Sequence, residues 1–143
     1  MGIKRSGHAV WRGGLKDGKG AVSTDSGILK DTPYDFRKRF ENDPGTNPEE
    51  LIAAAHAACF SMALSLALGQ EGMTAESIDT RATVTLEQVA GGFAVTSSHL
   101  DTTVRIPGAD RAKFDKAAEG AKSGCPISKL LNAKITMEAR LAY

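Results

Sequence analysis

Residues 47–69 decide the fold of this chain, and they read NPEELIAAAHAACFSMALSLALG. Asn47 is a favoured N-cap residue, and Pro48 suits the first helical position, where its missing N–H costs nothing. Glu50 lies three residues after Asn47, in capping-box position. The stretch therefore predicts a long helix that begins at Pro48 and ends at Gly69 or Gly72.

This predicted helix has no charged side chain over the 19 residues from Leu51 to Gly69. Its length of about 30 Å would match a membrane core. Seven of the residues are alanine, however, and His56 and Cys59 lie among them, so the stretch is less apolar than a membrane span. We expect a buried helix of a water-soluble protein with no membrane partner. Because a single chain has few elements to cover such a helix on all sides, we also expect it to pack against its copy in a homodimer.

Strand patterns lie on both sides of the helix. The segments with strand character are residues 8–12, 20–24, 33–40, 82–87, 93–106 and 134–141, with a bulge expected near 97–99. An amphipathic helix is predicted to start at Asp110, and Cys125 and Pro126 open a further helical turn. This order predicts an α+β domain with a largely antiparallel sheet.

The composition is that of one ordinary globular domain, residues 1–143, with 41% hydrophobic and 24% charged residues. A net charge of +1 argues against a nucleic-acid partner. The N-terminus lacks the apolar run of a signal peptide, so we expect a cytoplasmic protein. In that reducing compartment, two cysteines favour catalysis or redox chemistry over a structural disulfide.

The two cysteines differ in their local sequence. Cys59 lies in the middle of the long helix, where a small buried apolar side chain is the ordinary interpretation. Cys125 precedes Pro126 at a helix start, where backbone N–H groups and the helix dipole lower a thiol pKa. The cysteines are 66 positions apart and the histidines are scattered, so we expect no metal site. A two-thiol mechanism is the remaining chemistry.

A thiolate needs a cation, and the densest basic cluster is Arg37, Lys38 and Arg39. On an alternating strand, Arg37 and Arg39 would share a face, and Lys38 would be a solvated edge residue. Glu49 has no part in capping and is free to pair bidentately with one of the two arginines. His56 either lines the same site or is a hydrogen-bonded histidine at an interface.

Two motifs resemble the OsmC/Ohr family of thiol peroxidases: residues 45–63, GTNPEELIAAAHAACFSMA, and residues 124–128, GCPIS. The resemblance extends over the whole chain. It implies an α+β fold with largely antiparallel sheets around long central helices, in an intertwined homodimer with two active sites at the interface. It also implies a cytoplasmic thiol-dependent peroxidase without a bound cofactor, which reduces organic hydroperoxides and, more weakly, hydrogen peroxide.

The resemblance also assigns roles to the candidate catalytic residues. It implies that Cys59 is the peroxidatic thiol, that its sulfenic acid is resolved by Cys125, and that an external dithiol, of lipoyl type in one branch of the family, reopens the disulfide. Glu49 matches the family glutamate that orients an arginine. We assign that arginine, which stabilises the thiolate and the peroxide, to Arg39, with Arg37 in reserve.

Local chemistry and resemblance disagree on one point, because the helix start favours a low pKa at Cys125 while the family assigns the attack to Cys59. We follow the family. Two alternative functions stay open: a hydrophobic-ligand-binding dimer whose thiols act as a stoichiometric peroxide sensor, and a structural stress protein with incidental cysteines.

Overall fold

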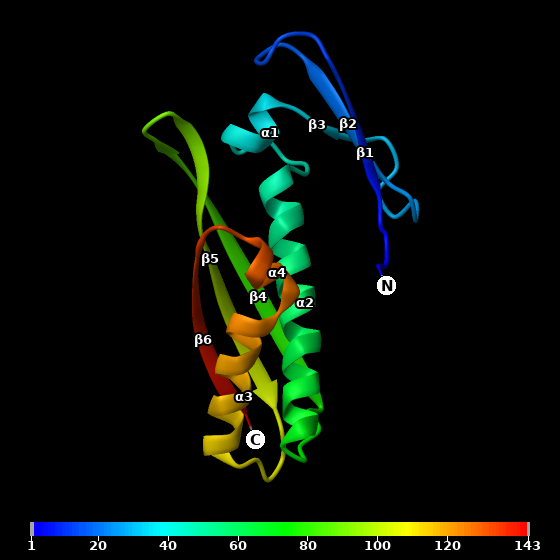
Figure 1. Cartoon of the computed structure of the whole chain (residues 1–143). Helices are drawn as coiled ribbons and strands as arrows, with labels where there is room; N and C mark the ends of the chain where they lie inside the picture. Colours follow the sequence, from blue (N-terminus) through cyan, green and yellow to red (C-terminus); the bar gives the residue numbers. More distant parts are fainter. Residues whose placement is uncertain (1, 143) are drawn as a thin grey trace. The chain divides into compact units, whose positions relative to one another are not determined.

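Three short strands of the N-terminal part pair antiparallel in chain order: β1 (Gly7–Arg12), β2 (Lys19–Thr24) and β3 (Thr32–Tyr34) (Figure 1). The first two confirm the predicted strands. Gly20 on β2 lets the rings of Trp11 and Tyr34 approach to 5.6 Å between centroids, since a Cβ at this position would lie 2.6 Å from the Tyr34 ring.

The computed structural model describes residues 2–142, and its contacts divide the chain into two compact units with the boundary between Leu51 and Ile52. Each unit is described by itself below. The expectation that the chain is one domain stays a prediction.

The prediction of a strand over residues 33–40 is wrong beyond Tyr34. Residues after it form the short helix α1 (Phe36–Phe40), because the carboxylate of Asp35 accepts a hydrogen bond from the backbone N–H of Lys38 at 3.0 Å and caps the helix. Arg37 and Arg39 therefore do not share a strand face.

Helix α2 (Pro48–Gln70) begins as predicted. The side-chain oxygen of Asn47 accepts a hydrogen bond from the backbone N–H of Glu50 at 2.8 Å. The helix ends before Gly72, whose φ of +77° lies in the left-handed region, and the N–H of Met73 bonds back to the carbonyl of Leu68. Both ends of α2 thus follow from local sequence signals.

The C-terminal unit contains a sheet in the order β4-β5-β6. Strands β4 (Ser77–Val89) and β5 (Gly92–Arg105) form an antiparallel hairpin, and β6 (Lys134–Ala142) pairs parallel to β5. The register shifts opposite Thr85 and Leu86, so the bulge on β5 falls at Thr96, one residue before the predicted segment. The α+β class and the largely antiparallel pairing are confirmed.

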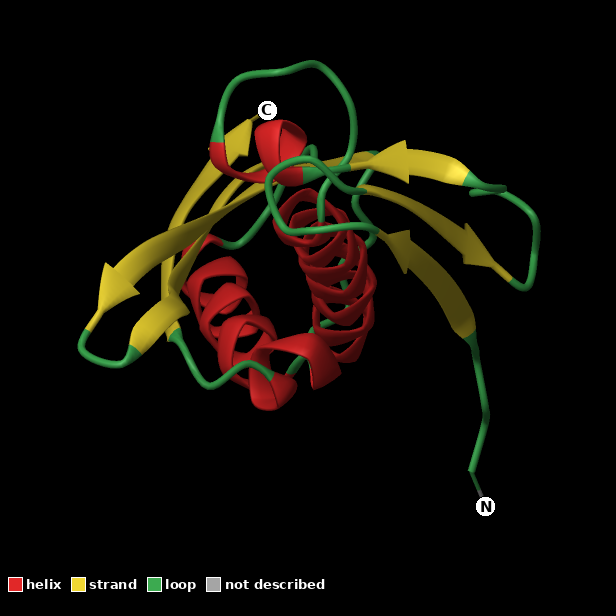
Figure 2. Ribbon diagram, turned by 90° about the horizontal axis from the view of Figure 1, so that it is seen from above, coloured by secondary structure: helices red, strands yellow, loops and turns green. Residues whose placement is uncertain are grey.

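Helix α2 and helix α3 (Arg111–Gly124) lie against the same face of this sheet (Figure 2), and the short helix α4 (Pro126–Leu130) follows α3. The core is a single cluster from both helices and β5. Its largest fully buried apolar side chains are Phe60, Leu64, Leu68, Leu100, Val104 and Phe114. Cys125 is buried in the same cluster, so the core positions one of the two thiols.

Only one stripe of α2 is fully buried, formed by His56, Phe60, Leu64 and Leu68. On another face, Met62 is 77% and Leu66 is 66% exposed. Within the described residues α2 is the one helix long and apolar enough to cross a membrane, but a helix of a protein core passes the same test. The single chain therefore leaves an apolar stripe of α2 uncovered.

Candidate active site

The two cysteines meet in the C-terminal unit. Cys59 is half-buried on α2 and packs against the core cluster, and Cys125 is the fully buried N-cap of α4. The two thiols influence each other: Cys125 raises the pKa of Cys59, and Cys59 lowers the pKa of Cys125. Both cysteines are free. Packing of α4 beside α2 thus brings together two thiols that are 66 positions apart in the sequence.

Cys125 is the more acidic of the two thiols in this unit. Burial raises its pKa, but the hydroxyl and backbone N–H of Ser128, the Cys59 thiol and the backbone N–H of Ile127 stabilise the thiolate, and the net pKa is lowered. The two Ser128 donors lie 3.5 and 3.4 Å from the Cys125 sulfur. The sulfur therefore acts as the helix cap, which explains why a cysteine occupies a position that cysteine rarely favours.

Cys59 shows the opposite behaviour. Burial raises its pKa, the backbone N–H of Ile127 lowers it, and the neighbouring Cys125 thiol raises it further. All of these influences come from burial, a backbone amide or the neighbouring thiol. Within this unit, Cys59 therefore needs a further positive group before it becomes a reactive thiolate.

The pair Arg39 and Glu49 lies in the N-terminal unit. The guanidinium donates two parallel hydrogen bonds, from Nε to Oε1 at 3.0 Å and from Nη2 to Oε2 at 2.9 Å. The Glu49 side chain is only 12% exposed and the Arg39 side chain 39%. The expected bidentate pairing of Glu49 is confirmed, with Arg39 as its partner. Arg37 instead forms an exposed ion pair with Glu41 at 3.6 Å.

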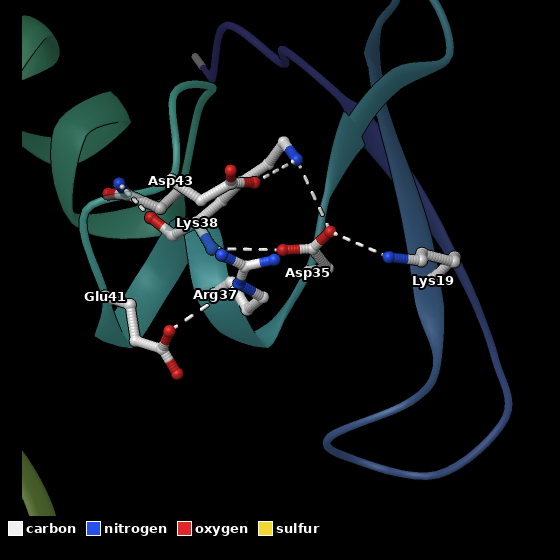
Figure 3. A network of polar contacts seen from close by, with 7 residues as sticks. Lys19, Asp35, Arg37, Lys38, Glu41 and Asp43 are labelled. Atoms are coloured by element: carbon white, nitrogen blue, oxygen red, sulfur yellow. Dashed lines mark hydrogen bonds and ion pairs between the residues drawn. The ribbon is translucent and has the colours of Figure 1, made fainter.

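A polar network fixes the helix that carries Arg39 (Figure 3). The carboxylate of Asp35 accepts hydrogen bonds from the amines of Lys19 and Lys38, and Lys38 also bonds Asp43 at 2.8 Å. The backbone N–H of Lys38 is the main cause that lowers the pKa of Asp35 from 3.8 to about 2. The expectation that Lys38 is a solvated edge residue is wrong, because its side chain is 18% exposed and bound at both sides.

Asn47 links α1 to the start of α2 within the same unit. Its amide nitrogen donates to the carbonyl of Lys38 at 3.0 Å, while its oxygen caps α2 through Glu50. One side chain thereby holds both elements that supply the ion pair of Arg39 and Glu49.

An aromatic pocket of about 290 Å³ adjoins Arg39. Its lining residues are Trp11, Leu15, Tyr34, Asp35, Phe36, Arg39 and Phe40. The Arg39 guanidinium lies 5.3 Å from the centre of the Phe40 ring. No expectation from the sequence included this pocket, although three of its aromatic residues lie close together between positions 34 and 40. The pocket combines an aromatic and aliphatic lining with two charged lining side chains, Asp35 and Arg39.

His56 is fully buried in the C-terminal unit. Its two ring nitrogens bond the hydroxyls of Ser98 at 2.7 Å and Ser128 at 2.8 Å. The structure thus places His56 in a hydrogen-bonded core position, next to Ser128, which also bonds the Cys125 sulfur. Sequence analysis did not identify either serine.

Comparison with known proteins adds the family. Residues 40–140 match the family described as OsmC-like protein, a range that includes Glu49, Cys59 and Cys125. The chain belongs to the OsmC-like family. Arg39 lies one residue before the matched range.

Individual relatives of this OsmC-like chain include Peroxiredoxin OsmC of Escherichia coli (strain K12), 55% identical over 99% of both chains. The organic hydroperoxide resistance protein of Xanthomonas axonopodis pv. citri (strain 306) is 30% identical over 94% of this chain and 92% of its own. Among solved structures, OhrB of Bacillus subtilis is similar with a TM-score of 0.66 and 26% identity, covering 96% of this chain and 98% of its own.

An OsmC-like protein of Mycoplasma pneumoniae matches the fold with a TM-score of 0.76 at 17% identity over 100% of both chains. The family resemblance and the fold class expected from the sequence are therefore confirmed. With them the enzyme class is confirmed as a thiol-dependent peroxidase of the OsmC-like family.

Proposed function

We propose that this protein reduces organic hydroperoxides to alcohols, and hydrogen peroxide more weakly, with Cys59 as the attacking and Cys125 as the resolving thiol. The observation that carries this proposal is that both thiols lie in one core, where each shifts the pKa of the other. The names of the relatives, a peroxiredoxin and an organic hydroperoxide resistance protein, support the same substrate class.

The proposed cycle balances with two thiols and one reductant. The Cys59 thiolate attacks the distal peroxide oxygen, the O–O bond breaks, and the alkoxide takes a proton to leave as an alcohol. The Cys125 thiolate then attacks the sulfur of the Cys59 sulfenic acid, an S–S bond forms, and hydroxide leaves and takes a proton to become water. An external dithiol, of lipoyl type in our proposal, reopens the disulfide by exchange.

The ion pair of Arg39 and Glu49 is proposed to serve the first step. A guanidinium held bidentately by a carboxylate stays fixed in direction, and its charge stabilises both a thiolate and a peroxide oxygen. The aromatic pocket beside Arg39 matches an alkyl or aryl group attached to that peroxide. This would explain a preference for organic hydroperoxides over hydrogen peroxide.

A homodimer is part of the proposal, because the exposed apolar stripe of α2 requires a cover. Small residues beside Met62 and Leu66, among them Ala55 and Ala58, permit a second helix to approach closely. In such a dimer, the proposed active sites form at the interface. We also propose that the protein acts in the cytoplasm.

Introducing a charge into this stripe is expected to yield monomers. In Met62→Glu, a carboxylate replaces a side chain that is 77% exposed in the single chain but buried in the proposed dimer, so association weakens. Light scattering at micromolar concentration measures the mass. Ile28→Glu, at a loop residue that is 85% exposed, is the matched control and should stay dimeric. A wild-type protein that is a stable monomer would refute the dimer.

Turnover tests the proposed activity as a whole. With a lipoyl dithiol present, the protein is expected to consume many equivalents of cumene hydroperoxide per subunit, and hydrogen peroxide more slowly. Consumption of peroxide is followed against time, with thioredoxin as the comparison reductant. A single stoichiometric oxidation with every dithiol would instead support the peroxide sensor.

A further inference from the structure

A chain of hydrogen bonds leads from a buried histidine to the resolving thiol. His56 Nε2 lies 2.8 Å from the hydroxyl of Ser128, and that hydroxyl donates to the Cys125 sulfur at 3.5 Å. On the other side of the ring, Nδ1 lies 2.7 Å from the hydroxyl of Ser98. His56, Ser98 and Cys125 are fully buried, and Ser128 is 9% exposed. The proposed peroxidase cycle uses no ring nitrogen, so this arrangement is still unexplained.

The protonation of the ring follows from its surroundings. Burial lowers the pKa of His56, so the ring is neutral at neutral pH and has one N–H donor and one acceptor. Ser128 has a single hydroxyl hydrogen, and it points at the Cys125 sulfur. Its oxygen must then accept from Nε2–H, which leaves Nδ1 to accept from the hydroxyl of Ser98. One tautomer therefore satisfies all three contacts.

We propose that His56 is a positioning residue: through Ser128 it aims a hydroxyl hydrogen at the Cys125 sulfur and holds Cys125 ready to attack the Cys59 sulfenic acid. The inference rests on the proposed function for the identity of that attack. In this step the S–S bond forms and the S–O bond of the sulfenic acid breaks, while hydroxide leaves and is protonated to water. His56 donates no proton to the reaction and only fixes the direction of the Ser128 hydroxyl.

A second hydroxyl chain in the same unit shows what a purely structural network looks like. Ser61 donates to Thr80 at 2.8 Å, and Thr80 pairs with the fully buried Thr102 at 2.9 Å. This chain satisfies its hydroxyls without a ring and none of its three hydroxyls bonds a thiol in the described contacts. Buried hydroxyls can therefore satisfy one another without a histidine. At Ser128, the histidine has a further effect, because it fixes the direction of the hydroxyl hydrogen.

The electrostatic surroundings of Cys125 are simple enough for a clean test. Its pKa is shifted by burial and by three residues, Ser128, Ile127 and Cys59. Of these residues, only Cys59 has a titratable side chain. Burial is the cause of the shift at His56. Replacing Cys59 by serine thus leaves one thiol whose titration reports on Ser128 and His56.

The first arm titrates Cys125 in a Cys59→Ser background by the ultraviolet absorbance of the thiolate. Adding Ser128→Ala is expected to raise the Cys125 pKa by about one to two pH units, because a hydrogen bond to the charged form is lost. His56→Leu should raise it in the same direction, and His56→Gln, which keeps an amide donor near the Nε2 position, should restore part of the shift.

Thr102→Val is the matched control, since it removes a fully buried hydroxyl of similar shape from the structural chain. It should lower the free energy of unfolding without moving the Cys125 pKa. An unchanged pKa in both Ser128→Ala and His56→Leu, with folding intact, would overturn the inference and leave His56 as a core residue only.

The second arm uses the protein with both cysteines. After a single addition of peroxide, the Cys59 sulfenic acid in Ser128→Ala should persist about tenfold longer, measured by trapping with dimedone, while its formation rate is unchanged. If the wild-type protein consumes no peroxide although the first arm shows the pKa shift, the proposed function fails and the resolving role with it, but the hydrogen-bond relay stands. If peroxide is consumed and neither pKa nor lifetime changes, the inference alone fails.

Discussion

Cys59→Ser is expected to abolish peroxide reduction. A serine hydroxyl is far less acidic and less nucleophilic than a thiol, so no sulfenic acid can form at position 59. Catalytic loss of cumene hydroperoxide with a dithiol present should fall to the rate without protein. Circular dichroism is the check on folding, and we expect little change because Cys59 is only half-buried.

Cys125→Ser is the matched variant and should behave differently. It is expected to consume about one equivalent of peroxide and then stall at the Cys59 sulfenic acid or a higher oxide, which intact mass would show. This difference between the two variants is a strict test of the assigned roles, because the lower pKa of Cys125 would by itself favour Cys125 as the attacking thiol. If Cys59→Ser consumes one equivalent and Cys125→Ser none, the two roles are exchanged. If peroxide-treated wild-type protein contains neither a disulfide nor any other oxidised cysteine, both cysteines are incidental.

The elements with strong local signals could be predicted from the sequence. Asn47 and Pro48 mark the start of α2 by side-chain capping and by a missing N–H, and both effects act within one helical turn. The alternation of β6 likewise follows from one exposed and one covered sheet face. Such features depend on neighbours in the sequence, and for this reason their prediction is correct.

The segment after Tyr34 shows where a local pattern misleads. Its charged residues fit an exposed edge strand. In the structure, however, the Asp35 carboxylate caps α1 by accepting from the backbone N–H of Lys38. The Lys38 amine then bonds two carboxylates, those of Asp35 and Asp43. The two phenylalanines at positions 36 and 40 are four residues apart, a spacing that fits one face of a helix. The capping aspartate was the signal that could have separated helix from strand.

The site was predictable only in part for a similar reason. Glu49 had no local role, which pointed to a partner, and the partner is Arg39. The contacts of His56 join residues 42 and 72 positions apart, through hydroxyls that no pattern marks. The sequence also cannot reveal which neighbours shift a thiol pKa, because they depend on packing between α2 and α4.

If Arg39 has the proposed role, Arg39→Met is expected to slow the attack on peroxide by at least about tenfold, because a cation in the active site lowers a thiol pKa by about one unit or more. The need is strong, since the pKa of Cys59 is raised by burial in its own unit. The measurement is the second-order rate of Cys59 oxidation at neutral pH. The loss should shrink as the pH rises toward the thiol pKa, because hydroxide then supplies the thiolate that Arg39 no longer stabilises.

Arg37→Met is the matched control for that loss. Arg37 has the same charge, lies two residues away and forms only an exposed pair with Glu41, so screening by solvent leaves it little influence and the rate should stay within about twofold of wild type. Glu49→Gln should fall between the two arginine variants, because the cation remains but loses its bidentate anchor. A slow Arg37→Met beside a normal Arg39→Met would transfer the role to Arg37. Wild-type rates in all three variants would mean that neither arginine activates Cys59.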